Sequence, residues 1–341
     1  MGRWESSLRR DNLAAAVVRE LPAISAASVI QNCADVGHGN GSYAPSDSNG
    51  AVGKNNIVAV TRAGIGLYDK STCLLARYTE SLESFFGLPP GGFSNESYPR
   101  ALYDAGSKRF FVTAFSPKNQ YFAVSTDETG TRWYEYKLPL TPHYCFTPAF
   151  QPIGDTFLNA GYSRTRWFLT GEIHQYVFIA SAIVSIDKAA SLKGASVTVA
   201  CFPDVGPFKP GLAPPIVLDG SSVAQFLTTF TPFTRFPPPP PQTNIFRRNL
   251  TISPKGPAFD LVQDIQPVTI PSWSLWHGTA ISPQLTQITQ PNGQILSEDS
   301  AGFESFASPS IQAGGFIWNV HMIGINGMRG YASISSILPP V

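Results

Sequence analysis

Short segments rich in β-branched and aromatic residues recur along this chain between clusters of turn-forming residues. From Asn56 onward they follow one another about every ten to fifteen residues, with no helical periodicity between them. Such spacing is typical of antiparallel sheets in a sandwich, a barrel or a propeller. The clearest predicted strands are Ile57–Val60, Arg109–Phe115, Tyr121–Ser125, Arg132–Lys137, Arg166–Thr170, Tyr176–Ile186, Ser196–Phe202, Val223–Thr229, Phe246–Ile252 and Gly315–Ile323.

The composition supports an all-β fold. Gly (29) and Pro (30) break long helices, and charged residues make up only 14% of the chain. These values exclude a coiled coil, a helical solenoid and a charge-rich disordered chain, while 23 Phe and 12 Tyr can fill a large core. Pro-rich pieces predict extended loops between strands, and the run of five prolines indicates polyproline II. These pieces are Pro203–Pro215, Pro237–Pro241 and Pro267–Pro271.

One segment before the strands has the pattern of an amphipathic helix. In the stretch from Glu5 to Leu21, Leu13 and Val17 are four residues apart and share one face with Leu21, and Pro22 ends the pattern. We therefore expect residues 1–32 to form an N-terminal helical arm and residues 33–341 to form a single β domain. The arm either docks on that domain or binds a neighbouring molecule.

The charge of the chain is nearly balanced. Lys and Arg number 24 against 23 Asp and Glu, and no region concentrates basic residues, so the sequence excludes a nucleic-acid footprint. The longest apolar run, Tyr176–Ile186, has about half of the roughly 20 residues that a membrane helix needs. We expect no membrane insertion from this chain.

The start of the chain shows no signal peptide, because charged residues from Arg3 to Asp11 precede any apolar stretch. Either a leader has been removed, or the chain reaches its destination without one. A surface poor in charge and rich in Ser, Thr, Asn and Gln is common in extracellular and particle-forming proteins. We expect an extracellular or particle-surface location.

Four cysteines are spread along the chain, and none forms a C-x-x-C pair, which argues against a structural zinc site. They allow two disulfides in three connectivities, or buried free thiols that pack as small hydrophobic groups. The sequence leaves both alternatives open. The four residues are Cys33, Cys73, Cys145 and Cys201.

A tripeptide repeats where two predicted strands meet tight turns. Leu67-Tyr68-Asp69 and Leu102-Tyr103-Asp104 share the same sequence, and each precedes a short polar stretch. An Asp at the first turn position accepts hydrogen bonds from backbone N–H groups two and three residues later. The separation of the two copies matches the length of a β-propeller blade.

The residues around this repeat resemble a family of mostly uncharacterised, generally secreted proteins that look like β-propellers. Segments 49–58, 66–72, 103–112 and 123–134 resemble its NGAVGPNHVV, YDK-T, YD…RWFV and AVS-TSDPTG-WY motifs, and 316–321 resembles a later strand. Family members begin with a secretion signal and continue for several strands beyond the segment resembling 316–333. The resemblance therefore implies an incomplete or open propeller, with a sheet edge exposed for a partner.

The stretch from Ser125 to Trp133 also resembles the Asp-box of sialidase-type propellers, with one extra residue before Gly130. In such a turn Asp127 accepts hydrogen bonds from the backbone, Gly130 supplies a positive φ, and Trp133 packs beneath. The motif is structural and implies no catalytic role. We predict Ser125, Asp127, Gly130 and Trp133 as a structural turn motif.

No catalytic or metal-binding constellation emerges from the sequence. The histidines are widely spaced, the acidic residues form no obvious pair, and the arginines lack the cluster of a sialidase. The histidines are His38, His143, His174, His277 and His321. The available acids include Glu96, Asp155, Glu172, Glu298, Asp299 and Glu304. The arginines are Arg100, Arg164, Arg166 and Arg235. Loop aromatics that either stack on sugars or fill the core are Tyr98, Tyr144, Trp167, Trp273 and Trp276.

These observations predict an all-β, β-propeller-like domain with antiparallel four-stranded blades, with a β-sandwich as the alternative. We expect a non-enzymatic binding or assembly protein without cofactor or metal, engaging a glycan or protein partner through loops and an open sheet edge. The first alternative is an extracellular hydrolase acting on glycans. The second is a structural surface component of a larger particle, with the 5–21 helix as its docking arm.

Overall fold

The computed structural model describes residues 48–62, 64–93, 97–116, 119–139, 154–175, 177–205, 212–228, 242–263, 266–273, 287–289, 295–297, 309–325 and 328–337. Contacts divide the chain into Met1–Ala34 and Asp35–Val341, and all described residues belong to the second unit. The predicted arm, including its helix, lies outside the described residues.

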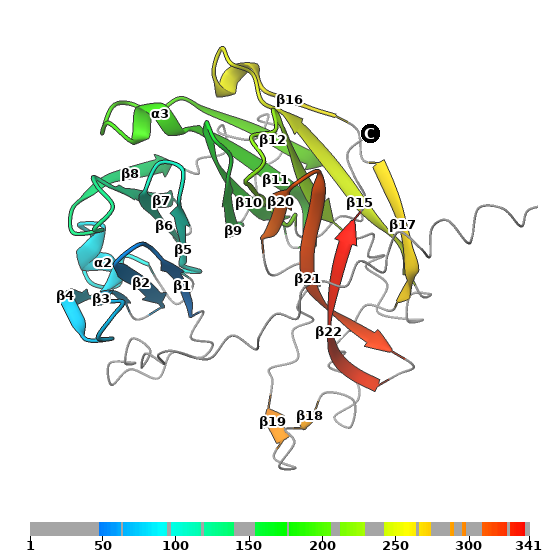
Figure 1. Cartoon of the computed structure of the whole chain (residues 1–341), viewed down its shortest axis with the longest axis horizontal. Coiled ribbons are helices and arrows are strands. Elements are labelled where there is room, and N and C mark those ends of the chain that lie inside the picture. Colours follow the sequence, from blue (N-terminus) through cyan, green and yellow to red (C-terminus); the bar gives the residue numbers. More distant parts are fainter. Residues whose placement is uncertain are drawn as a thin grey trace, which may run out of the picture. The chain divides into compact units, whose positions relative to one another are not determined.

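The fold is all-β and β-propeller-like. Strands β1 (Asn49–Val52), β2 (Asn56–Thr61), β3 (Gly64–Asp69) and β4 (Leu75–Glu80) form one antiparallel sheet in chain order. The next four, β5 (Arg100–Asp104), β6 (Arg109–Ser116), β7 (Asn119–Ser125) and β8 (Trp133–Pro139), repeat the arrangement (Figure 1). A four-stranded meander in chain order is the unit of a propeller blade, whereas sandwiches rely on Greek-key crossovers.

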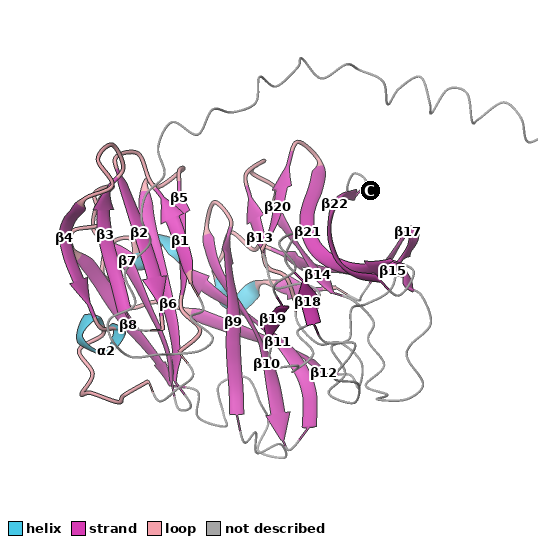
Figure 2. Cartoon of the chain, turned by 90° about the horizontal axis from the view of Figure 1, so that it is seen from below, coloured by secondary structure: helices cyan, strands magenta, loops and turns pink. Residues whose placement is uncertain are grey.

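A third meander contains β9 (Gly154–Tyr162), β10 (Arg166–Gln175), β11 (Val177–Asp187) and β12 (Val199–Val205). Strand β13 (Pro215–Val217) extends this sheet, because it pairs in parallel with β9 on one side and with β20 (Ser310–Ala313) on the other. Antiparallel strands β21 (Phe316–Ile325) and β22 (Met328–Ile337) complete an eight-stranded sheet. Figure 2 shows these strands as ribbons coloured by secondary structure.

The remaining described elements are short or belong to smaller sheets. Strand β15 (Gln242–Thr251) pairs with β14 (Val223–Thr228), β16 (Leu261–Val262) and β17 (Gln266–Trp273), and β18 (Gln287–Thr289) pairs with β19 (Ile295–Ser297). The helical turns are α2 (Leu82–Phe85), α3 (Lys188–Ser191) and the 3-10 turn Pro257–Phe259. Ser81 and Asp187 cap α2 and α3 by accepting hydrogen bonds from backbone N–H groups.

The side chains of β6 point alternately to the two faces of its sheet, and both faces are buried. Phe110 and Val112 point to one face and pack with residues of β2 and β3, whereas Phe111 points to the other face and packs with Trp167 of β10. All four side chains are fully buried. A third apolar cluster contains Phe168 of β10 and residues of β14 and β15. Because both faces of β6 are covered, its sequence is almost continuously apolar.

The ten predicted strands are all present, with ends that differ by a few residues. The interpretation of Pro267–Pro271 as loop is wrong, because β17 spans it and pairs with β15 from Gln266 to Trp273. Proline is tolerated in a strand whose N–H groups are not needed by a neighbour. The run Pro237–Pro241 lies outside the described residues.

Cys73 and Cys201 are both disulfide-bonded, so the alternative of buried free thiols is wrong for these two residues. Cys73 follows β3 in a turn and has a φ of 59°. Cys33 and Cys145 lie outside the described residues. The disulfide-bonded Cys73 therefore has a backbone conformation that amino acids other than glycine rarely adopt.

Candidate functional site: a groove beside the Asp127 turn

The turn between β7 and β8 is built by side-chain hydrogen bonds to the backbone. Asp127 Oδ1 accepts the N–H of Thr129 at 2.8 Å, and Ser125 Oγ donates to the carbonyl of Asp127 at 2.7 Å. The same hydroxyl accepts the N–H of Phe110 at 2.9 Å, which ties the turn to β6. Donation by the Thr129 hydroxyl holds the pKa of Asp127 below its ordinary value. The turn is thereby fixed on two strands.

Gly130 lies at the bend of this turn with a φ of +71°. A Cβ atom placed there would meet the ring of Phe110 at 3.1 Å. The position therefore needs glycine both for its backbone conformation and for the approach of the ring. This matches the role expected for glycine in the turn motif.

Trp133 begins β8 directly after the turn and is half-buried. Its ring makes an edge contact with Phe85 of α2 at 5.4 Å between centroids and lies 6.5 Å from the ring of Phe110. The Ser81 hydroxyl accepts the N–H of Ser84 and so fixes the short helix that presents Phe85. The result is an aromatic wall made by helix α2 and strand β8.

A groove of about 1000 Å³ opens against this wall. Its lining comes from the end of β4, from α2, from the Asp127 turn and from the start of β8. The residues that give it chemistry are Glu80, Phe85, Asp127, Arg132, Trp133 and Glu135. We name it the Trp133 groove. It combines an aromatic wall, formed by Phe85 and Trp133, with a lining that is otherwise mostly polar or charged.

Carboxylates outnumber the single arginine of the Trp133 groove. Glu80 accepts a hydrogen bond from the hydroxyl of Ser84 at 2.9 Å, which fixes one of them beside α2. Burial, and then the negative charge of Glu80, raises the pKa of Glu135 above its ordinary value of 4.5. Glu135 therefore takes up a proton more readily than Asp127, whose pKa is lowered.

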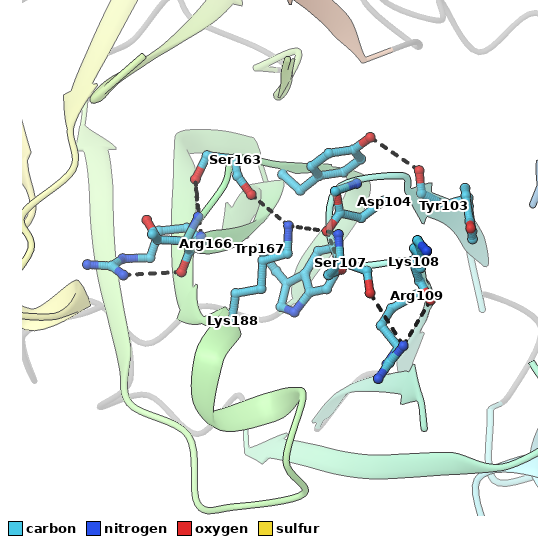
Figure 3. A network of polar contacts seen from close by, with 12 residues as sticks. Tyr103, Asp104, Ser107, Lys108, Arg109, Ser163, Arg166, Trp167 and Lys188 are labelled. Carbon is cyan, nitrogen blue, oxygen red and sulfur yellow. Dashed lines mark hydrogen bonds and ion pairs between the residues drawn. The ribbon is translucent and has the colours of Figure 1, made fainter. Parts of the chain in front are cut away.

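A second polar network surrounds the buried side chains of Lys188 and Asp104 (Figure 3). Lys188 at the start of α3 donates to Asp104 Oδ2 at 2.6 Å and to the carbonyl of Ser163 at 2.7 Å. Its ammonium group lies 4.4 Å from the ring centroid of Trp167 and 4.8 Å from that of Tyr162. Lys188 is only 2% exposed, so this cluster offers no access to a ligand. Its contacts join the sheet of β5 to the sheet of β9 and β10.

The titration of this network follows from its burial. Burial raises the pKa of Asp104, but Lys188 and the Ser107 donors outweigh this effect and hold the pKa below 3.8. Burial lowers the pKa of Lys188 despite the opposing effect of Asp104. Burial, and then Asp104, raises the pKa of Tyr162 to about 12, and its hydroxyl donates to the carbonyl of Tyr103 at 3.2 Å. Burial thus opposes the charged form of both partners, and their mutual attraction favours it.

Another buried ion pair uses one of the arginines considered above. Arg166 Nε lies 3.1 Å from Asp260 Oδ2, and its Nη2 lies 3.2 Å from Asp260 Oδ1. The hydroxyl of Ser185 and the N–H of Ser253 also donate to Asp260. Arg166 thus connects β10 to the turn after β15 and is not available for a substrate carboxylate.

The structure brings few of the other candidates together. Trp167 is fully buried in the core, Arg164 is exposed, and Tyr98 lies under the Arg62 guanidinium at 5.3 Å. Within the described residues no group of His, Cys, Asp and Glu is arranged to hold a metal ion. Candidates whose side chains lie outside the described part are the five histidines, Glu96, Asp155, Glu172, Glu298, Asp299, Glu304, Arg235, Tyr144, Trp273 and Trp276.

These features define a β-propeller-like protein with an open groove at the edges of two four-stranded sheets. No known protein-family model matches the chain. No curated protein matches it either. Among the described residues, no helix is long and apolar enough to cross a membrane.

Solved structures that share a partial likeness with the chain include three examples. The first is the subtype N10 neuraminidase-like protein of A/little yellow-shouldered bat/Guatemala/060/2010, at 9% identity over 86% of this chain and 82% of that one, with a TM-score of 0.35. The second is hemopexin fold protein CP4 from cow pea, at 15% identity over 66% and 94%, with a TM-score of 0.25. The third is Citrobacter koseri AztD, at 10% identity over 86% and 74%, with a TM-score of 0.31. Likeness at this level assigns no function.

Proposed function

We propose that the protein is a non-enzymatic binding protein that engages a glycan in the Trp133 groove. The observation that carries this proposal is the meeting of Trp133 and Phe85 in a groove with carboxylates and one arginine at its sides. Aromatic rings pack against the apolar C–H faces of sugar rings, and charged side chains hydrogen-bond to sugar hydroxyls. The groove provides both kinds of contact.

The test is calorimetric titration of a panel of oligosaccharides into the full chain. We expect one class of sugar to bind, and expect Arg132→Ala and Glu135→Gln to weaken binding at least tenfold while the thermal midpoint stays unchanged. Glu83→Gln is the matched control, because Glu83 lies on α2 but not in the groove lining. Unchanged affinity in both groove variants would contradict the proposal.

A glycan-acting hydrolase is the alternative, favoured by Glu80 and Glu135 lining one groove. Glycosidases use two carboxyl groups, one of which stays protonated by virtue of a raised pKa. Glu135 has a raised pKa. Turnover of aryl glycosides that disappears in both Glu135→Gln and Glu80→Gln would establish the hydrolase, whereas binding without turnover supports the binding protein.

Location and assembly belong to the same proposal. The low charge and the disulfide-bonded Cys73 and Cys201 support an extracellular or particle-surface location, because disulfides persist in oxidising compartments. If the chain is instead a component of a larger particle held by its N-terminal arm, deleting residues 1–22 will abolish incorporation. Normal incorporation after that deletion would exclude the arm as the attachment.

A further inference from the structure

The turns at one end of the first two meanders are joined by hydrogen bonds. The N–H of Lys70 donates to the carbonyl of Asn55 at 2.8 Å, which joins the β3–β4 turn to the β1–β2 turn. Asn56 Nδ2 donates to the carbonyl of Thr129 at 2.6 Å and so joins these turns to the turn between β7 and β8. The β5–β6 turn lies at the same end, because β5 to β8 are consecutive antiparallel strands of one sheet.

The same surface continues across the third meander. Lys188 at the start of α3 contacts both Asp104, at the end of β5, and the carbonyl of Ser163, in the β9–β10 turn (Figure 3). Arg166, directly after that turn, donates through Nη2 to the carbonyl of Ser253 at 2.6 Å and so brings in the turn after β15. We name these seven connections the turn face. They are residues 53–55, 70–74, 105–108, 126–132, 163–165, 188–198 and 252–260.

Each connection of the turn face carries one exposed basic side chain. Among the residues whose side chains the structure describes, eight Lys and Arg are exposed, and only Lys137 of β8 lies outside the turn face. The exposed cations are therefore gathered at one end, although the net charge of the whole chain is only +1. The seven of the turn face are Lys54, Lys70, Lys108, Arg132, Arg164, Lys193 and Lys255.

The carboxylates at the same turns are engaged by the fold. Asp104 and Asp260 are buried in ion pairs. Three further carboxylates, those of Asp69, Asp127 and Asp187, accept hydrogen bonds from backbone N–H groups of their own turns. These acids shape the turns and are at most half-exposed, whereas the cations beside them extend into solvent.

Two other acids lie at this end of the described sheets. Glu128 is half-buried in the β7–β8 turn, and Asp219 is exposed in the β13–β14 turn, where it accepts the N–H of Ser221. The N–H of Ile252 donates to the carbonyl of Ser222, so the β13–β14 turn lies beside the turn after β15. Within the described residues of this end, seven exposed cations thus face one exposed carboxylate, which makes the surface electropositive.

We propose that the turn face binds a linear polyanionic glycan, whose successive units carry sulfate or carboxylate groups. Its cations lie on separate turns, and turns that are two strands apart in one sheet are spaced by roughly 10 Å. A polymer with repeated charges can therefore contact several of these cations at once, so that individually weak ion pairs add up. The disulfide-bonded Cys73 lies in the β3–β4 turn of the same surface. An oxidising compartment favours an acidic glycan over a nucleic acid as the partner.

This surface differs in chemistry from the Trp133 groove. The groove offers an aromatic wall and carboxylates, whereas the turn face offers cations, and only Arg132 belongs to both. The proposal for the turn face therefore stands independently of the proposal for the groove. Glu135→Gln, which alters only the groove, should leave binding of a polyanion unchanged, so the two proposals can fail separately.

The test is calorimetric titration of a size-defined heparin oligosaccharide into the full chain, with an uncharged dextran of similar length for comparison. We expect only heparin to bind, and expect its affinity to fall at least tenfold between about 50 and about 300 mM NaCl, because salt screens exposed charges. The triple variant Lys108→Asn, Arg164→Gln and Lys193→Gln should weaken binding at least tenfold at low salt. Asparagine suits position 108, where φ is 57°. Lys137→Gln is the matched control, because Lys137 is exposed but lies outside the turn face.

Several results would overturn the proposal. They are an absence of heparin binding at low salt, binding that the triple variant leaves intact, and an equal loss in Lys137→Gln, which would indicate unspecific attraction of charge. Tighter binding to vesicles of anionic phospholipid, or to single-stranded DNA of equal charge, would assign the turn face to a different partner. Thermal unfolding of each variant checks that the fold persists, as expected for substitutions at exposed positions.

Discussion

The ammonium nitrogen of Lys188 lies 2.6 Å from Oδ2 of Asp104, and this contact links the turn between β5 and β6 to the start of α3. Asp104 also accepts N–H groups of Gly106 and Ser107, so one carboxylate both shapes its own turn and holds the next meander. The equivalent Asp69 accepts the N–H groups of Ser71 and Thr72 in an exposed turn and has no such second role. One sequence motif therefore serves two structural purposes.

Lys188→Met should destabilise the fold by about 3–5 kcal/mol, because it leaves the carboxylate of Asp104 buried without its cation. The double variant with Asp104→Asn should recover part of this loss, since no charge then stays buried. Urea unfolding measures both effects. Lys193→Met, at an exposed position, is the control and should change the free energy of unfolding by less than about 0.5 kcal/mol.

Stability should fall in acid partly through Asp104. Its pKa is lower in the folded chain than its ordinary value of 3.8, so the unfolded chain binds the proton more readily. The stabilisation from Asp104 is therefore complete above pH 5 or so and is lost as the pH falls through the folded pKa. Urea unfolding between pH 2 and pH 7 should show a smaller acid slope for Asp104→Asn than for the wild type. Equal slopes would contradict this account, although Asp69 and Asp127 leave a residual slope.

Gly130→Ala should cost more than Gly220→Ala, although the two φ angles are nearly equal at +71° and +72°. Both substitutions strain the backbone by about 1 kcal/mol, but only at position 130 does the new methyl group meet a ring, that of Phe110. We expect an additional loss of about 1 kcal/mol there. Thermal unfolding of the two variants gives the difference directly, and equal losses would show that Phe110 moves aside freely.

Reduction of the disulfides should lower the thermal midpoint. Since Cys73 and Cys201 are both disulfide-bonded, we expect a loss of about 2–4 kcal/mol for each bond that is reduced. Alkylation of the denatured, unreduced protein followed by peptide mass analysis should leave both residues unmodified. Alkylation of either one would show that its disulfide does not form.

Acidification should weaken glycan binding in the Trp133 groove. The loss should begin at a pH above the ordinary pKa of a glutamate. Burial beside Glu80 raises the pKa of Glu135, so this residue stops accepting hydrogen bonds from sugar hydroxyls before an exposed carboxylate would. Titrations between pH 4 and pH 7 should show the loss in the wild type. The Glu135→Gln variant should bind more weakly and with little pH dependence across this interval.

The strands β6 and β7 were predictable from their runs of aromatic and β-branched residues, because a strand that is covered on both faces needs such residues. The strand β17 was missed, since its prolines indicate a loop and only its pairing with β15 shows otherwise. The hydrogen bonds of the Asp127 turn were predictable because they are local. The Trp133 groove was not, because Glu80 and Glu135 come from the outer strands of separate sheets.

The same limit applies to Lys188. The residues around Lys188 in the sequence are typical of an exposed turn. No local pattern indicates that its side chain packs against the rings of Trp167 and Tyr162. The repeat around Asp104 predicted the turn that positions the carboxylate, but it did not indicate which cation the carboxylate contacts. Contacts between sheets depend on how the chain folds back, which local patterns do not encode.

The strand β13 has a consequence for the order of folding. It lies between β9 and β20, so its parallel pairs connect residues near 160 with residues near 310. The meanders β1–β4 and β5–β8 need only nearby residues and can form as soon as they leave the ribosome. The eight-stranded sheet must wait until almost the whole chain has been synthesised, and until β20 is made β13 keeps an unpaired edge.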